Sequence, residues 1–366
     1  MLKALLIAGS VVVLLGTVLP LFRTDAWWVR VFDFSHLQIA ILGLLLAIAL
    51  VFSRGMFPPT FGWTLLAVAG LCVAANFCWI FPYTRLASKQ VLPAKGNQEM
   101  VSVLAANVLQ GNRNAKTLLD IIRETNPDLI LITEADERWT RELQSLTNEY
   151  RHTLLHPLEN TYGISLYSRL PLVNPEVRFL TDRGVPSIRT GVRCGGQEVL
   201  FYGVHPRPPG RPAENDHEPM DSTQRDAELV LVAKEIQKVK GPVIVAGDFN
   251  DVAWSHTSRM FRRISRLLDP RVGRGFFNTY HARIPILRFP LDHLFHSDDF
   301  TLVKIERLKK IGSDHFPILA VLRLEPGAAA EQEAPPKKPS DEREAVESVQ
   351  RNREHEAEDG AAVAKH

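Results

Sequence analysis

The chain has 366 residues, of which 45% are hydrophobic and 23% charged, so it can bury a large core and hold more than one structural part. A net charge of −5 on residues 325–366 leaves +7 on the remainder, which excludes the strongly basic stripe of a nucleic-acid binder. The three cysteines have no regular spacing, which excludes a disulfide framework and a cysteine-rich zinc site.

Three stretches near the amino terminus carry no charged residue and are long enough to cross a membrane. They are residues 4–22, 37–53 and 55–84, and a helix needs about 17 to 25 residues to cross the hydrocarbon core. Trp27, Trp28 and Trp63 lie near the ends of these stretches, where interfacial aromatic residues belong. We therefore predict that residues 1–98 form a membrane anchor of three transmembrane helices and a linker.

The orientation of this anchor stays open. The first stretch follows Lys3 as the core of a secretory signal peptide does, but it is longer than such a core and no convincing cleavage site follows. Three spans place the two ends of the chain on opposite sides of the membrane. Basic residues in the loops favour the cytoplasm for the larger part, whereas the signal-like start favours the other side. We expect an integral protein of the bacterial inner membrane.

Residues 99–324 have the pattern of a soluble α/β domain. Short apolar runs predict strands over residues 101–106, 129–133, 163–167, 190–193, 199–204 and 243–247, and a last strand that ends at Leu324. Helices are predicted over residues 117–124, from Ser222 to Gly241, and over 255–267. The first strand, helix and strand favour parallel pairing, which places Asn107 and Glu134 at one sheet edge. Residues 325–366 have almost no large apolar residues and are predicted to be a disordered charged tail.

Polar residues follow the apolar strands at six places. They are Asn107, Glu134, His205, Asp248 with Asn250, Asp292, and Asp314 with His315. Asp248 and Asn250 alternate about Phe249, so both would leave an extended backbone on one face. Any one of these residues is most simply a turn residue, and only their combination points to a site. Oxygen ligands and imidazoles without cysteine fit Mg²⁺ or Mn²⁺ better than zinc.

Over residues 100–324 the sequence resembles the endonuclease/exonuclease/phosphatase superfamily of metal-dependent phosphoesterases. The motifs that carry the resemblance are Ala106-Asn107, Thr133-Glu134, Gly203-Val204-His205, Gly247-Asp248-Phe249-Asn250, Leu291-Asp292-His293 and Gly312-Ser313-Asp314-His315. The resemblance implies an α/β fold, a four-layered sandwich of two packed sheets flanked by helices. It also implies in-line attack of a positioned water on a phosphoester.

The same resemblance implies a metal ligand set and a base. Glu134 would be the principal metal ligand, aided by Asn107 and Asp314. Asp248 would orient or deprotonate the attacking water. Asn250 would position the phosphate or the water by hydrogen bonds.

The remaining roles concern the histidines. His315, paired with Asp292, would donate to a phosphate oxygen, and His205 would contact the phosphate or assist the leaving group. His205 stands where the apurinic-site endonucleases of the superfamily have a tyrosine, so the chain looks more like the deoxyribonuclease, sphingomyelinase and phosphatase branches. His293 is expected to be structural, and Asp251 a turn residue. Arg207 and Tyr162 are open candidates for contacts near the site.

We therefore expect a membrane-anchored, Mg²⁺-dependent phosphoesterase whose partners are the bilayer and a lipid or lipid-linked phosphate. A membrane-tethered nuclease is the rival hypothesis, because the basic residues between Arg259 and Arg266 could touch a nucleic-acid backbone. No aromatic stacking platform interleaves those charges, however. A non-catalytic docking domain is the third hypothesis, and it is disfavoured because no catalytic position is degraded.

Overall fold

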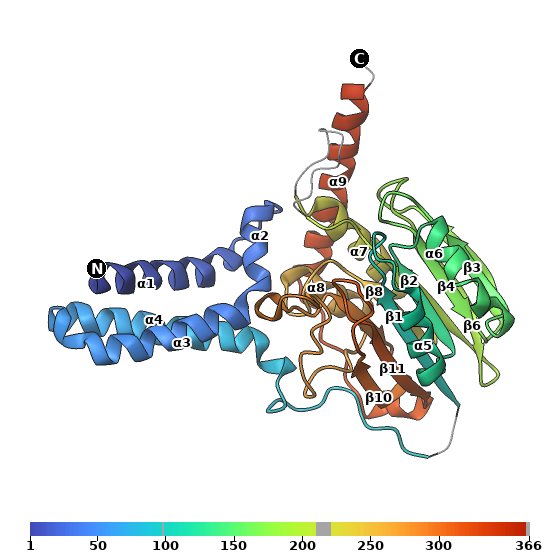
Figure 1. Cartoon of the computed structure of the whole chain (residues 1–366), viewed down its shortest axis with the longest axis horizontal. Helices are drawn as coiled ribbons and strands as arrows, with labels where there is room; N and C mark the ends of the chain where they lie inside the picture. Colours follow the sequence, from blue (N-terminus) through green and yellow to red (C-terminus); the bar gives the residue numbers. More distant parts are fainter. Residues whose placement is uncertain (97–98, 210–220, 364–366) are drawn as a thin grey trace.

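This computed structural model describes residues 1–96, 99–209 and 221–363. Apolar helices form a bundle at the amino terminus, two β-sheets with flanking helices follow, and a long helix ends the described chain (Figure 1). The bundle projects from one side of the two-sheet domain, and its free end carries the amino terminus.

The bundle consists of α1 (Leu2–Val18), α3 (His36–Ser53) and α4 (Pro59–Ile80), followed by the short turns η1 (Leu19–Leu21), η2 (Arg54–Met56) and η3 (Phe81–Tyr83). With these turns the helices are 20, 21 and 25 residues long, and each is long and apolar enough to cross a membrane. Many of their large apolar side chains are exposed, as Leu45 and Leu71 are. Gly43 permits close packing, because a Cβ there would lie 2.9 Å from Val73 Cγ2. The three predicted apolar helices are therefore present.

A short helix that was not predicted, α2 (Trp27–Phe34), joins α1 to α3. It runs across the end of the bundle, next to the two-sheet domain (Figure 1). Arg30 and Asp33 lie on its buried side, whereas Trp27, Trp28 and Val31 are exposed. The helix α2 thus has one buried face with charged residues and one exposed face with large apolar residues, at the end of three helices that are apolar enough to cross a membrane.

The following domain contains two sheets. One has the strand order β10-β11-β1-β2-β4-β3 and the other β5-β6-β7-β8-β9. The strands are β1 (Met100–Asn107), β2 (Leu129–Thr133), β3 (His152–His156), β4 (Ile164–Ser168), β5 (Leu172–Arg178), β6 (Ser187–Cys194), β7 (Gln197–Val204), β8 (Val243–Asp248), β9 (Asp292–His296), β10 (Phe300–Arg307) and β11 (Ile318–Leu324). The helices and turns are α5 (Ala115–Thr125), α6 (Glu137–Glu142), η4 (Gln144–Asn148), α7 (Thr223–Ile236), α8 (His256–Ser265) and η5 (Pro285–Leu287).

Alternate residues of the strands face different layers of the core. Val103 of β1 faces the second sheet and packs in one cluster with Phe201 of β7. Its neighbour Leu104 faces the other way and packs with Trp139 of α6. On the outer side of the second sheet, Val245 packs with residues of α7 and α8. These clusters produce the predicted four-layered sandwich, helices on sheet on sheet on helices.

Parallel strand pairs bring the polar strand ends together. β1 and β2 are parallel, with Asn107 opposite Thr133, so Glu134 follows directly beside Asn107 as predicted. β7 and β8 are also parallel, with Val204 opposite Gly247.

β3, β5, β9 and β10 were not among the predicted strands. The side chains of β3, β5 and β10 are largely half-buried or exposed and show no continuous apolar run, and three of the five residues of β9 are polar. Asp292 was predicted to follow a strand, whereas it is the first residue of β9.

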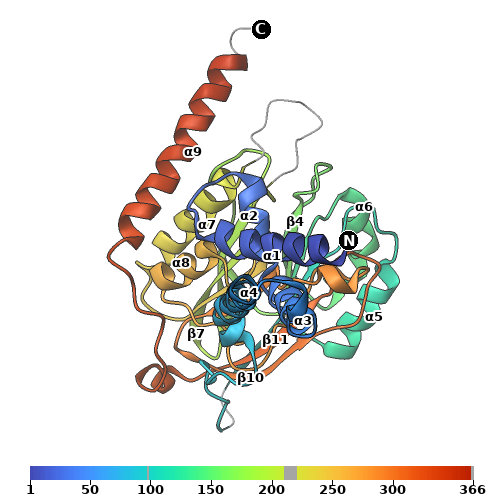
Figure 2. The ribbon, with the colours of Figure 1, turned by 90° about the vertical axis from the view of Figure 1, so that its left-hand side faces the viewer.

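The carboxy-terminal segment is not the disordered tail that its composition predicted. Its described part contains η6 (Pro326–Ala330) and α9 (Asp341–Val363), and α9 packs beside α7 (Figure 2). Buried Asp341 accepts two hydrogen bonds from the guanidinium of Arg263 in α8, at 2.9 and 2.7 Å. Ala345 joins the core cluster of α7 and α8. The prediction was wrong because it relied on the scarcity of large apolar residues in this segment. The buried ion pair of Asp341 with Arg263 and the small side chain of Ala345 instead hold α9 against α7 and α8.

A buried carboxyl group in α7 makes the stability of the domain depend on pH. Glu228 is 1% exposed, and burial, with Asp182 nearby, raises its pKa from 4.5 to about 8. Because its folded pKa exceeds its unfolded pKa, this group stabilises the fold fully only below about pH 4.5. Between about pH 4.5 and pH 8, its contribution to the free energy of unfolding falls by about 1.4 kcal/mol per pH unit as the pH rises. We expect Glu228→Gln to raise the melting temperature over wild type by an amount that grows from pH 5 to pH 8.

Thermal unfolding of the full chain in detergent measures this difference. Glu137→Gln, at an exposed position of α6, is the matched control and should show no such growth. A difference between Glu228→Gln and wild type that is the same at pH 5 and pH 8 would contradict the expectation.

Candidate active site

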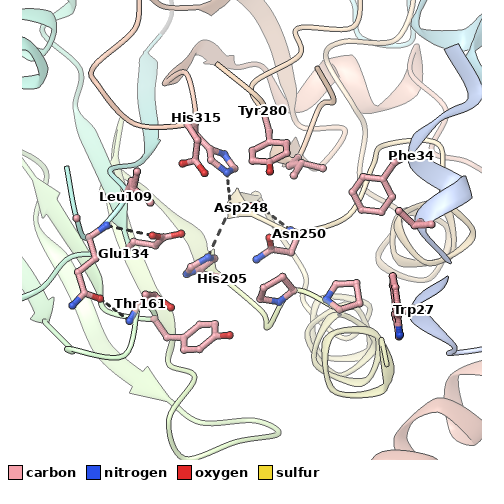
Figure 3. Close-up of a pocket in the computed structure, with 18 residues that line it drawn as sticks. Trp27, Phe34, Leu109, Glu134, Thr161, His205, Asp248, Asn250, Tyr280 and His315 are labelled. Carbon is pink, nitrogen blue, oxygen red and sulfur yellow. Dashed lines mark hydrogen bonds and ion pairs between the residues drawn. The ribbon is translucent and has the colours of Figure 1, made fainter. Parts of the chain in front are cut away.

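The polar strand ends open into one cavity of about 350 Å³ (Figure 3). Six of the eight predicted site residues line it: Glu134, His205, Asp248, Asn250, Asp314 and His315. The other two lie directly behind the lining residues. Asn107 donates hydrogen bonds to Glu134 and Asp248, and Asp292 is bonded to His315. The structure therefore brings all eight predicted residues together.

Asp248, the last residue of β8, is the centre of the polar cluster. Its side chain is 1% exposed, and its Oδ2 accepts a hydrogen bond from Asn107 Nδ2 at 3.0 Å. The same oxygen lies 3.5 Å from His315 Nε2 and 3.8 Å from His205 Nε2 (Figure 3). Burial raises the pKa of Asp248, while the charge of His315 opposes this shift. A carboxylate with a raised pKa is suited to accept a proton near neutral pH.

The backbone turns sharply after Asp248. Asn250 has a φ of 49°, and its backbone N–H donates to Asp248 Oδ1 at 2.9 Å. The predicted extended alternation about Phe249 is thus replaced by a side-chain-bonded turn, yet both polar side chains still line the cavity. Gly247 has a φ of 141°, and a Cβ there would lie 1.9 Å from the carbonyl oxygen of Val204. Only glycine lets β8 approach the end of β7 this closely.

The two histidines of the site have opposite charge preferences. His315 Nδ1 lies 2.7 Å from Asp292 Oδ2. Burial alone would lower the pKa of His315, but the carboxylates of Asp292 and Asp248 raise it to about 10. Burial lowers the pKa of His205 to about 4, against the attraction of Asp248. At neutral pH His315 is therefore an imidazolium and His205 a neutral imidazole.

Glu134 lies across the cavity from these histidines. Its Oε1 accepts from Asn107 Nδ2 at 2.8 Å and its Oε2 from the backbone N–H of Gln110 at 3.3 Å. Asn107 therefore presents its amide nitrogen to Glu134, while its Oδ1 accepts from the N–H of Leu109. Burial raises the pKa of Glu134, which the hydrogen bond from Asn107 opposes.

The donor set of this cavity fits a divalent cation. The carboxylates of Glu134, Asp248 and Asp314 line one small space, and hard oxygen donors are those that Mg²⁺ and Mn²⁺ prefer. A second grouping is also close-set, since ligand atoms of Asp248, Asp292 and His315 lie within 4.8 Å of one another. A buried cluster of carboxylates is costly without a compensating positive charge, which such an ion supplies.

Of the four other residues considered in the sequence analysis, only Tyr162 lines the cavity. His293 lies between Arg271, at 2.8 Å, and the carbonyl of Asp251, away from the cavity lining. Asp251 accepts hydrogen bonds from two serines at the start of α8 and so is more than a turn residue. Arg207 pairs with Asp182 at 2.9 Å. Tyr162 does line the cavity and packs against the His205 ring.

One wall of the cavity was not predicted from the sequence. Trp27, Val31 and Phe34 of α2 line it, opposite the strand ends (Figure 3). Their spacing of four and three residues puts them on one helical face. Tyr280 also lines the cavity and packs against His315, with 5.0 Å between ring centroids. The aromatic residues between the first two spans were the available signal, but they were assigned to the membrane interface alone.

Buried ion pairs hold α2 against the domain. Arg30 lies 2.9 Å from Asp33 Oδ2 and 3.6 Å from Asp226 Oδ2. Asp226 in turn accepts from the guanidinium of Arg225, whose Nη1 donates to the carbonyl of Asn250 at 3.0 Å. Ion pairs and hydrogen bonds between described residues thus connect α2 to the turn of Asp248 and Asn250.

The chain is similar to known proteins in sequence and in structure. Residues 104–315 match the endonuclease/exonuclease/phosphatase family. A UPF0294 protein of Vibrio cholerae is 35% identical over 97 residues, which are 26% of this chain and 33% of that protein, so the match spans about a third of the curated relative. A family member from Bacteroides thetaiotaomicron is 16% identical with a TM-score of 0.50, covering 63% of this chain and 100% of that one. D. rerio TDP2 in complex with a single-stranded DNA product is 16% identical with a TM-score of 0.49, covering 61% and 99%.

Proposed function

Because this chain belongs to the endonuclease/exonuclease/phosphatase family and is therefore a hydrolase of phosphoester bonds, we propose that it cleaves a phosphate mono- or diester at a membrane surface. The observation that carries the proposal is the convergence of eight polar side chains on one cavity, six in its lining and Asn107 and Asp292 directly behind them. Mg²⁺ or Mn²⁺ is the proposed cofactor, held by Glu134 and Asp314 with Asn107 beside them. When bound there, the cation offsets negative charge on the phosphoryl oxygens and helps the leaving oxygen depart.

Asp248 and Asn250 are the proposed centre of the chemistry. The oxygen of water forms a bond to phosphorus while the phosphorus–oxygen bond to the alcohol breaks, and Asp248 takes the proton of that water. The raised pKa of Asp248 supports this role. Asn250 holds the phosphate or the water by hydrogen bonds from the edge of the same turn.

The histidines act on the phosphate and the leaving group. His315, an imidazolium at neutral pH, donates a hydrogen bond to a phosphoryl oxygen as negative charge builds up there. Asp292 orients this ring through its 2.7 Å contact with Nδ1. Neutral His205 donates one hydrogen bond to the phosphate or to the leaving oxygen.

A lipid or lipid-linked phosphate is the proposed substrate class. Three helices are fit to cross a membrane, and α2, which joins two of them, lines the cavity. This arrangement supports a site that lies near the phosphates of membrane lipids. The Vibrio cholerae relative supports a bacterial source, and the three apolar helices support a location in the cell membrane.

The arginines of α8 do not support a nucleic-acid substrate. Arg263 is engaged by Asp341, and Arg262 by Tyr83 and Gln90. Arg259 stacks over Trp79, 4.0 Å from the ring centroid. These contacts engage three of the four guanidinium groups that the rival hypothesis assigned to a phosphate backbone, and Asp341 neutralises one of them, whereas Arg266 is exposed.

Removal of the metal tests the proposal. The full chain in nanodiscs is assayed on phospholipid and lipid-phosphate vesicles and on plasmid DNA, with Mg²⁺ and then with EDTA. We expect hydrolysis of the lipid phosphoester that falls by at least about 10²-fold with EDTA, because the cation stabilises the charge of the transition state. Added Mn²⁺ or Mg²⁺ restores it.

The other outcomes discriminate the alternatives. Faster cleavage of plasmid than of any lipid substrate would establish the nuclease instead. Metal binding without turnover of any phosphoester would favour a non-catalytic docking domain. Lipid hydrolysis that is unchanged by EDTA would contradict the proposed cofactor.

A further inference from the structure

The active-site cavity has a polar side and an apolar side that come from different parts of the chain. Asp248, Asn250 and His315 lie on the polar side, on the strand ends of the two-sheet domain. Trp27 and Phe34 of α2 stand on the opposite side, facing the same space (Figure 3). A phosphoester placed at Asp248 therefore has an apolar surface next to it that belongs to the membrane anchor.

This apolar surface is open, and the helix that carries it is fixed in place. Trp27 and Val31 are 43% and 48% exposed although they line a cavity. The opposite side of α2 is held by Arg30, which is bonded to Asp33, Asp226 and Thr257. Phe34 packs edge-on against Phe289, with 5.6 Å between ring centroids. A prearranged apolar wall lowers the entropy cost of binding a flexible apolar group.

The wall is continuous with the membrane-spanning part of the chain. α2 begins a few residues after η1, whose Leu21 and the following Phe22 are exposed, and α3 begins directly after α2. A hydrocarbon chain that lies on Trp27 and Val31 can therefore continue into the bilayer around α1 and α3. An alkyl chain would cover Val31 as well as the aromatic rings of Trp27 and Phe34, whereas a nucleobase or a sugar would stack on the rings alone and leave Val31 facing water.

We propose that α2 is the hydrocarbon subsite of the active site, formed by Trp27, Val31 and Phe34. It binds the part of an alkyl or isoprenoid chain nearest to the phosphate of a lipid phosphoester. This inference rests on the proposed phosphoester hydrolysis. It adds that the hydrocarbon subsite selects the substrate. The anchor is then part of the active site and not only a tether.

Substrates of graded chain length test the subsite. The full chain, in micelles of fixed detergent concentration with Mg²⁺, is assayed on alkyl p-nitrophenyl phosphodiesters from methyl to octyl, each kept below its micelle-forming concentration. In wild type we expect kcat/KM to rise by up to about fourfold per methylene group, the factor that about 0.8 kcal/mol provides. In Trp27→Ala we expect a clearly smaller increase of kcat/KM per methylene group. Val31→Ser, a smaller change to the same wall, should reduce this increase by less.

Trp28→Ala is the matched control. Trp28 is the neighbouring residue of the same helix and is 55% exposed, but it does not line the cavity. It should keep the wild-type dependence on chain length, and melting temperatures show whether each variant is folded. Equal slopes for folded Trp27→Ala, Val31→Ser and wild type would overturn the subsite.

Three further outcomes are decisive. A slope that Trp28→Ala flattens as much as Trp27→Ala does would overturn the subsite, because the effect would then belong to detergent contact. Hydrolysis of the methyl ester without any chain-length dependence refutes the subsite and leaves the proposed hydrolysis standing. A wild-type protein that hydrolyses no ester at all refutes both.

Discussion

Asparagine in place of Asp248 lowers kcat by about 10²- to 10⁴-fold, the contribution of a positioned proton acceptor. The carboxamide has the shape of the carboxylate and keeps one oxygen for the hydrogen bond from Asn107 Nδ2, but its N–H₂ group then faces the backbone N–H of Asn250. The carboxamide cannot take a proton from water. The melting temperature of the variant shows whether the domain stays folded. Steady-state kinetics on the best phosphoester at saturating Mg²⁺ measure the loss.

The matched control for this variant is Asp120→Asn. Asp120 lies on the exposed face of α5, where it pairs with Arg123. This change should leave kcat unchanged. A kcat of Asp248→Asn equal to that of wild type would remove Asp248 from the chemistry, whatever the geometry of the cavity.

Glutamine in place of Glu134 raises the Mg²⁺ concentration needed for half-maximal activity by at least about 10- to 100-fold. That range is the loss seen when only an outer partner of a metal ligand is removed, and Glu134 is proposed as a direct ligand. The variant also introduces an N–H₂ group where Asn107 and Gln110 both donate, so it disturbs the local hydrogen bonds. Activity titrated against Mg²⁺, together with calorimetric Mg²⁺ binding, separates affinity from turnover.

Glu137→Gln, three residues further on and exposed, is the control for Glu134→Gln and should titrate as wild type does. An unchanged Mg²⁺ requirement in Glu134→Gln would locate the ion elsewhere. The grouping of Asp248, Asp292 and His315 is then the next candidate. In that case Asp248→Asn, and not Glu134→Gln, shifts the Mg²⁺ titration.

The polar half of the site was predictable because its residues follow strands that the sequence marks clearly. Asn107 and Glu134 end two apolar runs separated by one helix, and that order forces parallel strands with their ends side by side. Asp248 and His315 come from the other sheet and a distant loop, so their proximity came from the resemblance and not from periodicity. In the structure Asp248 Oδ2 lies 3.5 Å from His315 Nε2, a contact that the two motifs alone only imply.

The apolar half was not predictable for a physical reason. The exposure of Trp27 and Val31 in a short segment between two spans fits a membrane interface and a cavity wall equally well. The ion pair of Arg30 with Asp226 places this segment against the two-sheet domain, as a cavity wall. No local sequence pattern predicts which acidic residue a distant arginine will pair with. The docking of α9 through Asp341 and Arg263 escaped prediction in the same way.

The chain of contacts from Arg30 through Asp226 and Arg225 to the carbonyl of Asn250 ties the turn of Asp248 and Asn250 to α2. In the proposed membrane-bound lipid hydrolase, this tie would fix the distance between the turn and the bilayer surface. A lipid with its scissile phosphate directly on the hydrocarbon would then reach Asp248, whereas a phosphate on a long glycan spacer would lie too far out. We therefore propose that the length of the headgroup, more than its chemistry, would limit which lipids are hydrolysed.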